Sequence, residues 1–203
     1  GLNRVVWNLR SDPFRRAPTS SEDDDWMGVG TGPEVLPGTY TVVVRFGDEE
    51  ARRSFDVLAD PRVTFTTADR RANWDARQRA GAMQDVLAEA LQRIVDARAD
   101  ADDVMARIER VRRDAKIDGA EWDEPEDAPL HDLAEAVKEF RKGLDDLEHS
   151  IRFDDEVEGI QGGERPWTEI TRASWFLGST WDRPSPDAMK HLERAESMAR
   201  EAL

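Results

Sequence analysis

Residues 80–115 read AGAMQDVLAEALQRIVDARADADDVMARIERVRRDA, and they decide the fold because their apolar residues recur three and four positions apart. This heptad spacing places the apolar residues along one face of a helix and is typical of a coiled coil. With Thr66 or Thr67 as the N-cap, the pattern predicts one helix over residues 68–116, about 70 Å long. The residues of this seam are Ala80, Met83, Leu87, Ala90, Ile94, Ala97, Ala101, Val104, Ile108, Val111 and Ala115.

The same spacing returns three more times toward the C-terminus. After a loop at 118–129, residues 130–151 predict a second helix that packs antiparallel on the first. Two shorter helices follow, one on each side of the break at 184–186. None of the four can bury its apolar stripe alone, so together they predict an antiparallel bundle over residues 67–203. The apolar positions are Leu133, Val137, Phe140, Leu144, Leu147 and Ile151, then Trp167, Ile170, Ser174 and Leu177, then Met189, Leu192, Ala195, Met198 and Ala202.

Residues 1–66 have the period of two that is typical of half-buried strands. A first strand is predicted at 4–9, followed by a long polar loop at 11–36. Two further strands, 37–46 and 49–60, form a hairpin that turns at Gly47-Asp48. The chain is therefore predicted to be α+β, with a β module at 1–66 and a helical bundle at 67–203. One face of the hairpin is predicted to carry Tyr40, Val42, Val44, Phe46, Phe55 and Val57.

The charge composition constrains the environment and the partners. The 203 residues carry 44 acidic and 29 basic side chains, a net charge of −15, and all the bases except Lys116, Lys138, Lys142 and Lys190 are arginines. Many acids with few lysines predict a halophilic, haloarchaeal source, and an ordinary acidic protein from a high-GC organism is the alternative. A nucleic-acid partner is excluded because the chain has no basic stripe. No apolar run reaches the length of a membrane span.

The sequence contains no reaction signature. It has no cysteine, and its histidines, His131, His149 and His191, are not spaced as metal ligands. The acidic run 22–25 lacks the alternating ligand pattern of a calcium loop. We therefore predict no catalytic, cofactor-binding or metal-binding residue in this chain, and no cofactor.

The seven tryptophans are the best remaining candidates for ligand contact. Trp26 and Trp122 fall in polar loops, where an exposed ring can stack on a sugar; packing over the junction between the two modules is the alternative. Trp7, Trp167 and Trp175 fall on apolar faces and are predicted to be core residues.

Three segments carry a resemblance to a known family: GLNRVVWNLR at 1–10, GPEVLPGTYTVVVRF at 32–46 and FDVLADPRV at 55–63. They resemble the C-terminal region of bacterial and archaeal BNR-repeat proteins, which are described as sortilin-like (VPS10) or glycosyl hydrolase-like. In that family similar segments belong to an immunoglobulin- or fibronectin-III-like module that is followed by a helical region. Asn8 departs from the family, which usually has Asp there, and so does the acidic loop at 19–25.

The resemblance implies a function but no site residues. The family's upstream portion is a β-propeller, in which any sugar hydrolysis or peptide binding would lie. The chain is therefore expected to be a non-catalytic accessory region that supports or associates with such a propeller, secreted or at the cell surface. A carbohydrate-binding or cell-surface adhesion module is the alternative. Because three strands are too few for a sandwich, a homodimer through the β module is also expected.

Overall fold

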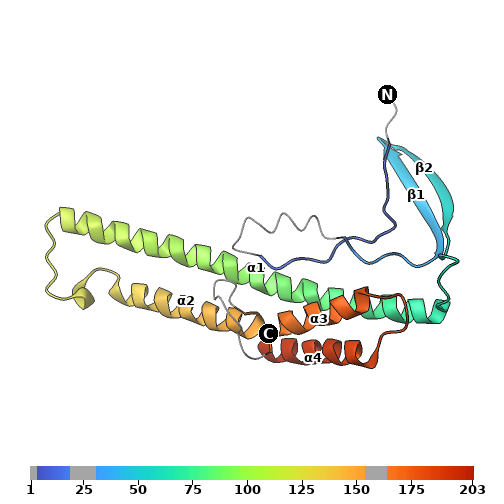
Figure 1. The fold of residues 1–203 in the computed structure, drawn as a ribbon. Helices are drawn as coiled ribbons and strands as arrows, with labels where there is room; N and C mark the ends of the chain where they lie inside the picture. The colour runs from blue at the N-terminus through green and yellow to red at the C-terminus, as the bar shows by residue number, and fades with distance from the viewer. Residues whose placement is uncertain (1–3, 19–30, 154–163) are drawn as a thin grey trace.

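The computed structural model describes residues 4–18, 31–153 and 164–203. A two-stranded antiparallel sheet comes first, and four α-helices and one 3₁₀ turn follow (Figure 1). This arrangement confirms the α+β class and the very long first helix. The elements are β1 (Gly38–Phe46), β2 (Glu49–Val57), α1 (Thr67–Ile117), η2 (Pro125–Asp127), α2 (His131–Ile151), α3 (Pro166–Gly178) and α4 (Pro186–Ala202).

Helix α1 runs unbroken for 51 residues. Its first turn is closed by Thr66, whose side-chain oxygen accepts a hydrogen bond from the Asp69 backbone N–H at 3.1 Å. Asp69 in the first turn and Lys116 in the last are both placed favourably for the helix dipole. Residue spacing alone therefore predicted both the existence and the bounds of this helix closely.

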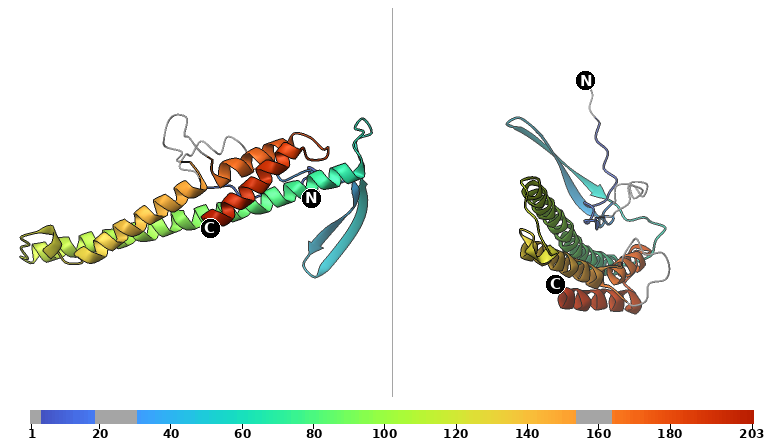
Figure 2. Two further views of the ribbon diagram at one scale, coloured as in Figure 1. Left: turned by 90° about the horizontal axis from the view of Figure 1, so that it is seen from below. Right: turned by 90° about the vertical axis from the view of Figure 1, so that its left-hand side faces the viewer.

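The other helices divide α1 into two halves. Helix α2 returns antiparallel along the C-terminal half, and α3 continues in the direction of α2 along the N-terminal half (Figure 1). Helix α4 then runs back beside α3, and it ends partway along α1 (Figure 2). The bundle thus has a three-helix body made of α1, α3 and α4. It also has a two-helix projection, made of residues 97–117 of α1 together with α2, which we call the arm.

The core lies mainly in the three-helix body. Leu87 and Ile94 of α1, both predicted seam residues, are buried there, and Ile151 at the end of α2 closes the core toward the arm. The other buried members are Ala76, Ala80, Leu91, Ile170, Ala173, Leu177, Ala188, Leu192, Ala195 and Ala199. In the arm the buried apolar contacts are fewer, namely Ala101, Ile108 and Ala134.

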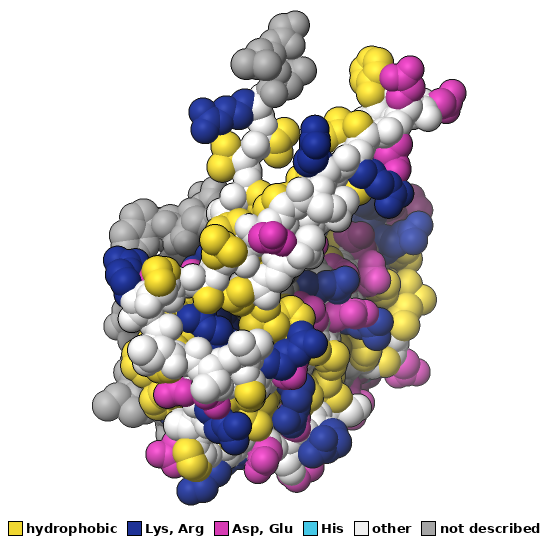
Figure 3. Space-filling model, turned by 90° about the vertical axis from the view of Figure 1, so that its right-hand side faces the viewer, with side chains coloured by type: hydrophobic (Ala, Val, Ile, Leu, Met, Phe, Trp, Pro, Cys, Tyr) yellow, Lys and Arg dark blue, Asp and Glu magenta, His cyan; other side chains and the backbone are white. Residues whose placement is uncertain are grey.

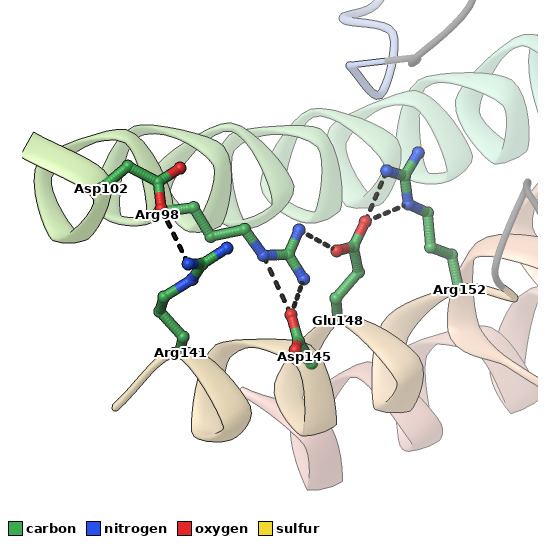
Figure 4. A network of polar contacts seen from close by, with 6 residues as sticks. All are labelled: Arg98, Asp102, Arg141, Asp145, Glu148 and Arg152. Carbon is green, nitrogen blue, oxygen red and sulfur yellow. Dashed lines mark hydrogen bonds and ion pairs between the residues drawn. The ribbon is translucent and has the colours of Figure 1, made fainter. Parts of the chain in front are cut away.

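An ion-pair network joins the two helices of the arm (Figure 4). Arg98 of α1 binds Asp145 at 2.6 Å and also Glu148, both on α2. The same Glu148 accepts a hydrogen bond from Arg152 at 2.7 Å, and Arg141 pairs with Asp102 at 2.9 Å. These contacts set the register in which α2 lies against α1.

The predicted strand at 4–9 is wrong for the described residues. Residues 4–9 carry no strand, and the only pairing there is an isolated bridge between Arg10 and Glu34. Leu9 has a positive φ of 60°, so the chain turns at this point. The backbone of residues 9–11 then forms hydrogen bonds with residues 33–35 instead of with β1. Ser11 N–H donates to the Pro33 carbonyl, and Val35 N–H donates to the Leu9 carbonyl.

Residues 11–18, which we call the strap, lie along α1. The Arg15 backbone N–H donates to Asp85 at 2.6 Å, and the Gln84 side chain donates to the Arg15 carbonyl at 2.6 Å. The Phe14 ring occupies the place where a side chain at Gly81 would be. The strap therefore ties part of the predicted β module to the bundle, while the division at residue 66 stays a prediction.

Candidate functional site

The β1–β2 hairpin projects from the bundle (Figures 1 and 2), and its register gives it two unlike faces. Its register pairs Tyr40 with Phe55, as predicted, so these two aromatic side chains share a face. The other face is polar and internally paired. Its contacts are Thr39 to Asp56 at 2.7 Å, Thr41 to Ser54 at 3.0 Å and Arg45 to Glu50 at 2.8 Å.

At its base the apolar face is covered by the N-terminal segment. The Trp7 ring lies 5.4 Å from the Tyr40 ring and 6.0 Å from the Phe55 ring, measured between centroids. The Trp7 indole N–H donates to the Arg10 carbonyl at 2.8 Å, which holds the ring in place. Trp7 is 39% exposed and so belongs to a surface cluster, instead of the core predicted from its pattern.

Beyond this cluster the apolar face is open. Val44 is 60% exposed and Phe46 85% exposed, and Val5 and Val6 of the N-terminal segment are also exposed. Figure 3 looks at this end of the molecule and shows hydrophobic side chains lying between the N-terminal segment and the hairpin. Arg53 and Glu49 lie on the same face, opposite Val42 and Phe46, so exposed apolar side chains and charges stand side by side there. Large exposed apolar side chains on a two-stranded sheet are typical of an interaction site.

Two adjoining cavities, of about 250 and 580 Å³, lie where the base of the hairpin meets the bundle. Their walls come from β2 and its flanking loop, the N-terminal segment, the first turns of α1 and the loop after α3. Arg70 and Trp74 line the smaller cavity, Arg77 lines both, and the Arg70 guanidinium lies 5.6 Å from the centroid of Trp181.

The charges around these cavities do not cancel. Arg10 is paired with Glu34 at 2.9 Å and Arg62 with Asp60 at 2.6 Å. Burial, and then the positive charge of Arg10, lower the pKa of Arg77, while Glu34 acts in the opposite direction. This corner of an otherwise acidic protein is therefore locally basic.

Two hydrogen-bond donors at this corner are unused. Arg70 Nη2 and Trp74 Nε1 are buried and have no acceptor among the described residues. A buried donor without an acceptor costs about 1–3 kcal/mol. The corner is thus suited chemically to a group that brings carbonyl or carboxylate oxygens.

Of the two residues predicted for ligand contact, Trp122 is not part of this site. Trp26 lies outside the described residues. Trp122 lies in the α1–α2 connection, at the end of the arm far from the hairpin, and is half-buried. It does not cover the junction between the modules, so that alternative is wrong for Trp122. Trp175, predicted as core, is 69% exposed on α3, while Trp167 is half-buried against the core as expected.

Sequence reasoning missed the cavity residues, although a signal exists. Arg70, Trp74, Arg77 and Gly81 recur three and four apart, on a face of α1 away from the heptad seam. A second missed feature is Glu169, fully buried in α3, which contacts His191 at 2.6 Å and Arg172 at 2.8 Å.

In the ranges 4–18, 31–153 and 164–203, no three metal-binding side chains come together, and no helix is long and apolar enough to cross a bilayer. Comparison of the chain with protein-family models, with curated proteins and with solved structures gave no match.

Proposed function

We propose that this chain is a non-catalytic accessory region of a larger β-propeller protein of the BNR-repeat, sortilin-like or glycosyl hydrolase-like kind. In this proposal the hairpin end associates with the β-rich part of that protein, and the helical bundle is the support that carries it. The family part of the proposal rests on the three resembling segments alone.

The observation that carries the association is the open apolar face of the hairpin. A two-stranded sheet is marginally stable in water, and here one face holds exposed valines and Phe46 while the outer edges of both strands are unpaired in the described sheet. Added strands or a packed domain would cover this face and pair the edges at once. The unused donors of Arg70 and Trp74 at the base of the hairpin are consistent with an incoming chain that brings acceptors.

Hydrogen exchange on residues 1–203 alone, and on the same residues joined to the β-propeller of the proposed larger protein, tests the association. We expect the β1 and β2 amides to exchange fast in the fragment and to be strongly protected in the longer protein. Replacing Val42 and Val44 together by Thr should remove that protection. Replacing Val43, which lies on the polar face, by Thr is the matched control. Equal exchange in both proteins would contradict the proposal.

The non-catalytic part of the proposal has its own test. Chromogenic glycosides and peptides offered to residues 1–203 in saturating salt should be hydrolysed only at background rates. Turnover that one acid-to-amide substitution abolishes would overturn this part and leave the association untouched.

A further inference from the structure

The arm carries an apolar stripe that nothing in the described structure covers. Its members are 36–52% exposed, although all of them fit the heptad pattern that predicts burial. They are Val104 and Val111 on α1 and Leu133, Phe140 and Leu147 on α2.

Helix geometry places these residues on one side of the arm. On α1, Ile94 and Ala101 form a buried line that faces the neighbouring helices. Arg98, four residues after Ile94, lies to one side of this line, where it makes its ion pairs. Val104, three residues after Ala101, lies to the other side of the line. The same relation holds on α2, where Arg141 lies on the ion-pair side and Phe140 on the other. Because the helices are antiparallel, the two apolar lines lie on the same side.

This stripe continues a groove that α4 fills in the body. Ala76, Met83 and Ala90 occupy the same line of α1 as Val104, at intervals of seven residues, and they pack against a core that includes the apolar residues of α4. Arg79, which lies two heptads before Arg93 on the same line of α1, pairs with Glu196 of α4 at 2.9 Å. Helix α4 therefore lies on the side of α1 that carries the stripe. Helix α4 ends partway along α1 (Figure 2), and beyond that point the same line of α1 is exposed at Val104 and Val111.

Charges of alternating sign flank the stripe on α1. Arg93, Asp100, Arg107 and Asp114 repeat every seven residues beside the valines. Arg93 contacts Glu89 on its own helix, whereas Asp100, Arg107 and Asp114 form no ion pair with the described residues. The α2 side of the stripe is flanked by Ala136, Gly143 and Ser150, which are small and uncharged.

From these features we infer that the arm binds the arm of a second copy of this chain, antiparallel, and completes a four-helix bundle. Turning one copy end for end places Asp100 opposite Arg107 of the other and Arg93 opposite Asp114. The Asp102–Arg141 ion pair puts the midpoint of these charges level with Phe140. The same twofold axis therefore packs Phe140 on Phe140 and Leu133 on Leu147.

The size of the contact fits a reversible dimer. An overlap from Arg93 to Asp114 is about 30 Å long, and two helices present a width of about 20 Å, which gives about 600 Å² per copy. Specific interfaces bury about 800 Å² per partner, so this one lies toward the small end and should dissociate in the micromolar range.

A charge exchange tests the pairing. Asp100→Arg and Arg107→Asp should each weaken dimerisation at least tenfold, because like charges then meet across the axis. An equimolar mixture of the two single variants, and the double variant alone, should recover the dimer. Arg113→Asp makes the same change of charge as Arg107→Asp on an exposed position on the opposite side of α1 from the stripe, and should have no effect. Sedimentation is measured at the lowest salt that keeps the helical signal, since salt screens these contacts.

Single cysteines test the direction, because the chain has none of its own. Phe140→Cys should form a disulfide-linked dimer, since the two residues meet on the axis. Leu133→Cys alone should not, because its two copies lie about 21 Å apart, but a mixture of Leu133→Cys with Leu147→Cys should. A parallel pairing would bring Phe140 opposite Val104 and leave Phe140→Cys unlinked.

Three results would overturn the inference. The first is a 23.0 kDa monomer at about 100 micromolar, roughly a hundred times the expected dissociation constant. The second is a dimer that both single charge variants leave intact. The third is a dimer that is lost on Val44→Asp in the hairpin but kept in the arm variants, which would place the contact on the sheet.

Discussion

Gly81 shows how one residue without a side chain positions a whole segment. It lies inside α1, where glycine costs about 1 kcal/mol relative to alanine. The Phe14 ring occupies the space above it, so the strap can lie flat on the helix. The helix gives up some local stability and gains the contact that holds residues 11–18.

The effect of Gly81→Ala on stability should therefore change sign when the Phe14 ring is removed. Gly81→Ala alone should destabilise the fold by about 1–2 kcal/mol, because the added methyl group displaces Phe14. In a Phe14→Ala background, where the space is free, Gly81→Ala should stabilise by about 1 kcal/mol through helix propensity. Denaturant unfolding of the four proteins measures both values. A destabilising effect of equal size in both backgrounds would show that Phe14 does not lie there.

Ion pairs and side-chain size, more than spacing, set how two helices face each other. The heptad pattern predicts helices at 68–116 and 130–151 within one or two residues, because an apolar period is a local property of the chain. It also predicts Leu133, Phe140 and Leu147 in the seam, yet these are about half exposed. Helix α2 instead turns Ala134 and Glu148 toward α1, where Arg98 binds Glu148. Whether α2 buries the line of Leu133 and Phe140 or the adjacent line of Ala134 and Glu148 depends on such long-range partners.

The strand expected at 4–9 failed for a related reason. Alternation at Val5, Trp7 and Leu9 shows only that the chain is extended with one apolar side. Whether it pairs with β1 depends on the turn at Leu9 and on the bridge to Glu34, which lies 24 residues further along. The site at the hairpin base draws on four separate segments, so its residues could not be grouped from local pattern alone.

The stability lost when a seam residue of α1 is replaced by Asp should depend on how deeply that residue is buried. Ile108 is 1% exposed, and Ile108→Asp should cost several kcal/mol because it buries an unpaired carboxylate. Val104, four residues earlier in the same predicted seam and 36% exposed, should lose less than about 1 kcal/mol as Val104→Asp in the monomer. Thermal unfolding at low protein concentration separates the two. Equal losses would mean that the arm buries both lines.

Glu148 should make the arm sensitive to acid. Burial raises the pKa of its carboxyl, but hydrogen bonds from Arg152 and Arg98 outweigh this, and the pKa is lowered from 4.5. A lowered pKa in the folded state adds stability above the unfolded-state pKa, and this contribution is lost as the pH falls through the folded-state value.

Glu148→Gln should therefore cost about 2 kcal/mol at pH 7, and the difference from wild type should shrink as the pH falls below the unfolded-state pKa and vanish below the lower folded-state pKa. Urea unfolding across that range measures it, with Glu139→Gln on the exposed side of α2 as the control. A difference that persists unchanged at the acid end would mean that the charge of Glu148 plays no part.

At the scale of the whole molecule, the net charge of −15 is spread over an elongated shape with a small core (Figure 1). Mutual repulsion between carboxylates opposes folding, and salt screens it within about 10 Å at 0.1 M and about 3 Å at 1 M. If the composition is halophilic, the fold depends on that screening.

The helical circular-dichroism signal should then fall as salt is lowered from molar to tens of millimolar, and the melting temperature should fall with it. The same titration with a non-ionic osmolyte at equal osmotic strength controls for exclusion effects. A melting temperature that does not change with salt would contradict the halophilic interpretation.

The continuity of α1 has a mechanical consequence. One unbroken helix joins the base of the hairpin to the tip of the arm, so a pull on the hairpin loads the backbone of α1 along its axis, without a hinge in between. In two copies joined by their arms, the starts of the two α1 helices would stand about 110 Å apart at 1.5 Å per residue. The pair would then act as a strut of defined length, holding two attached bodies at a fixed spacing and facing opposite ways.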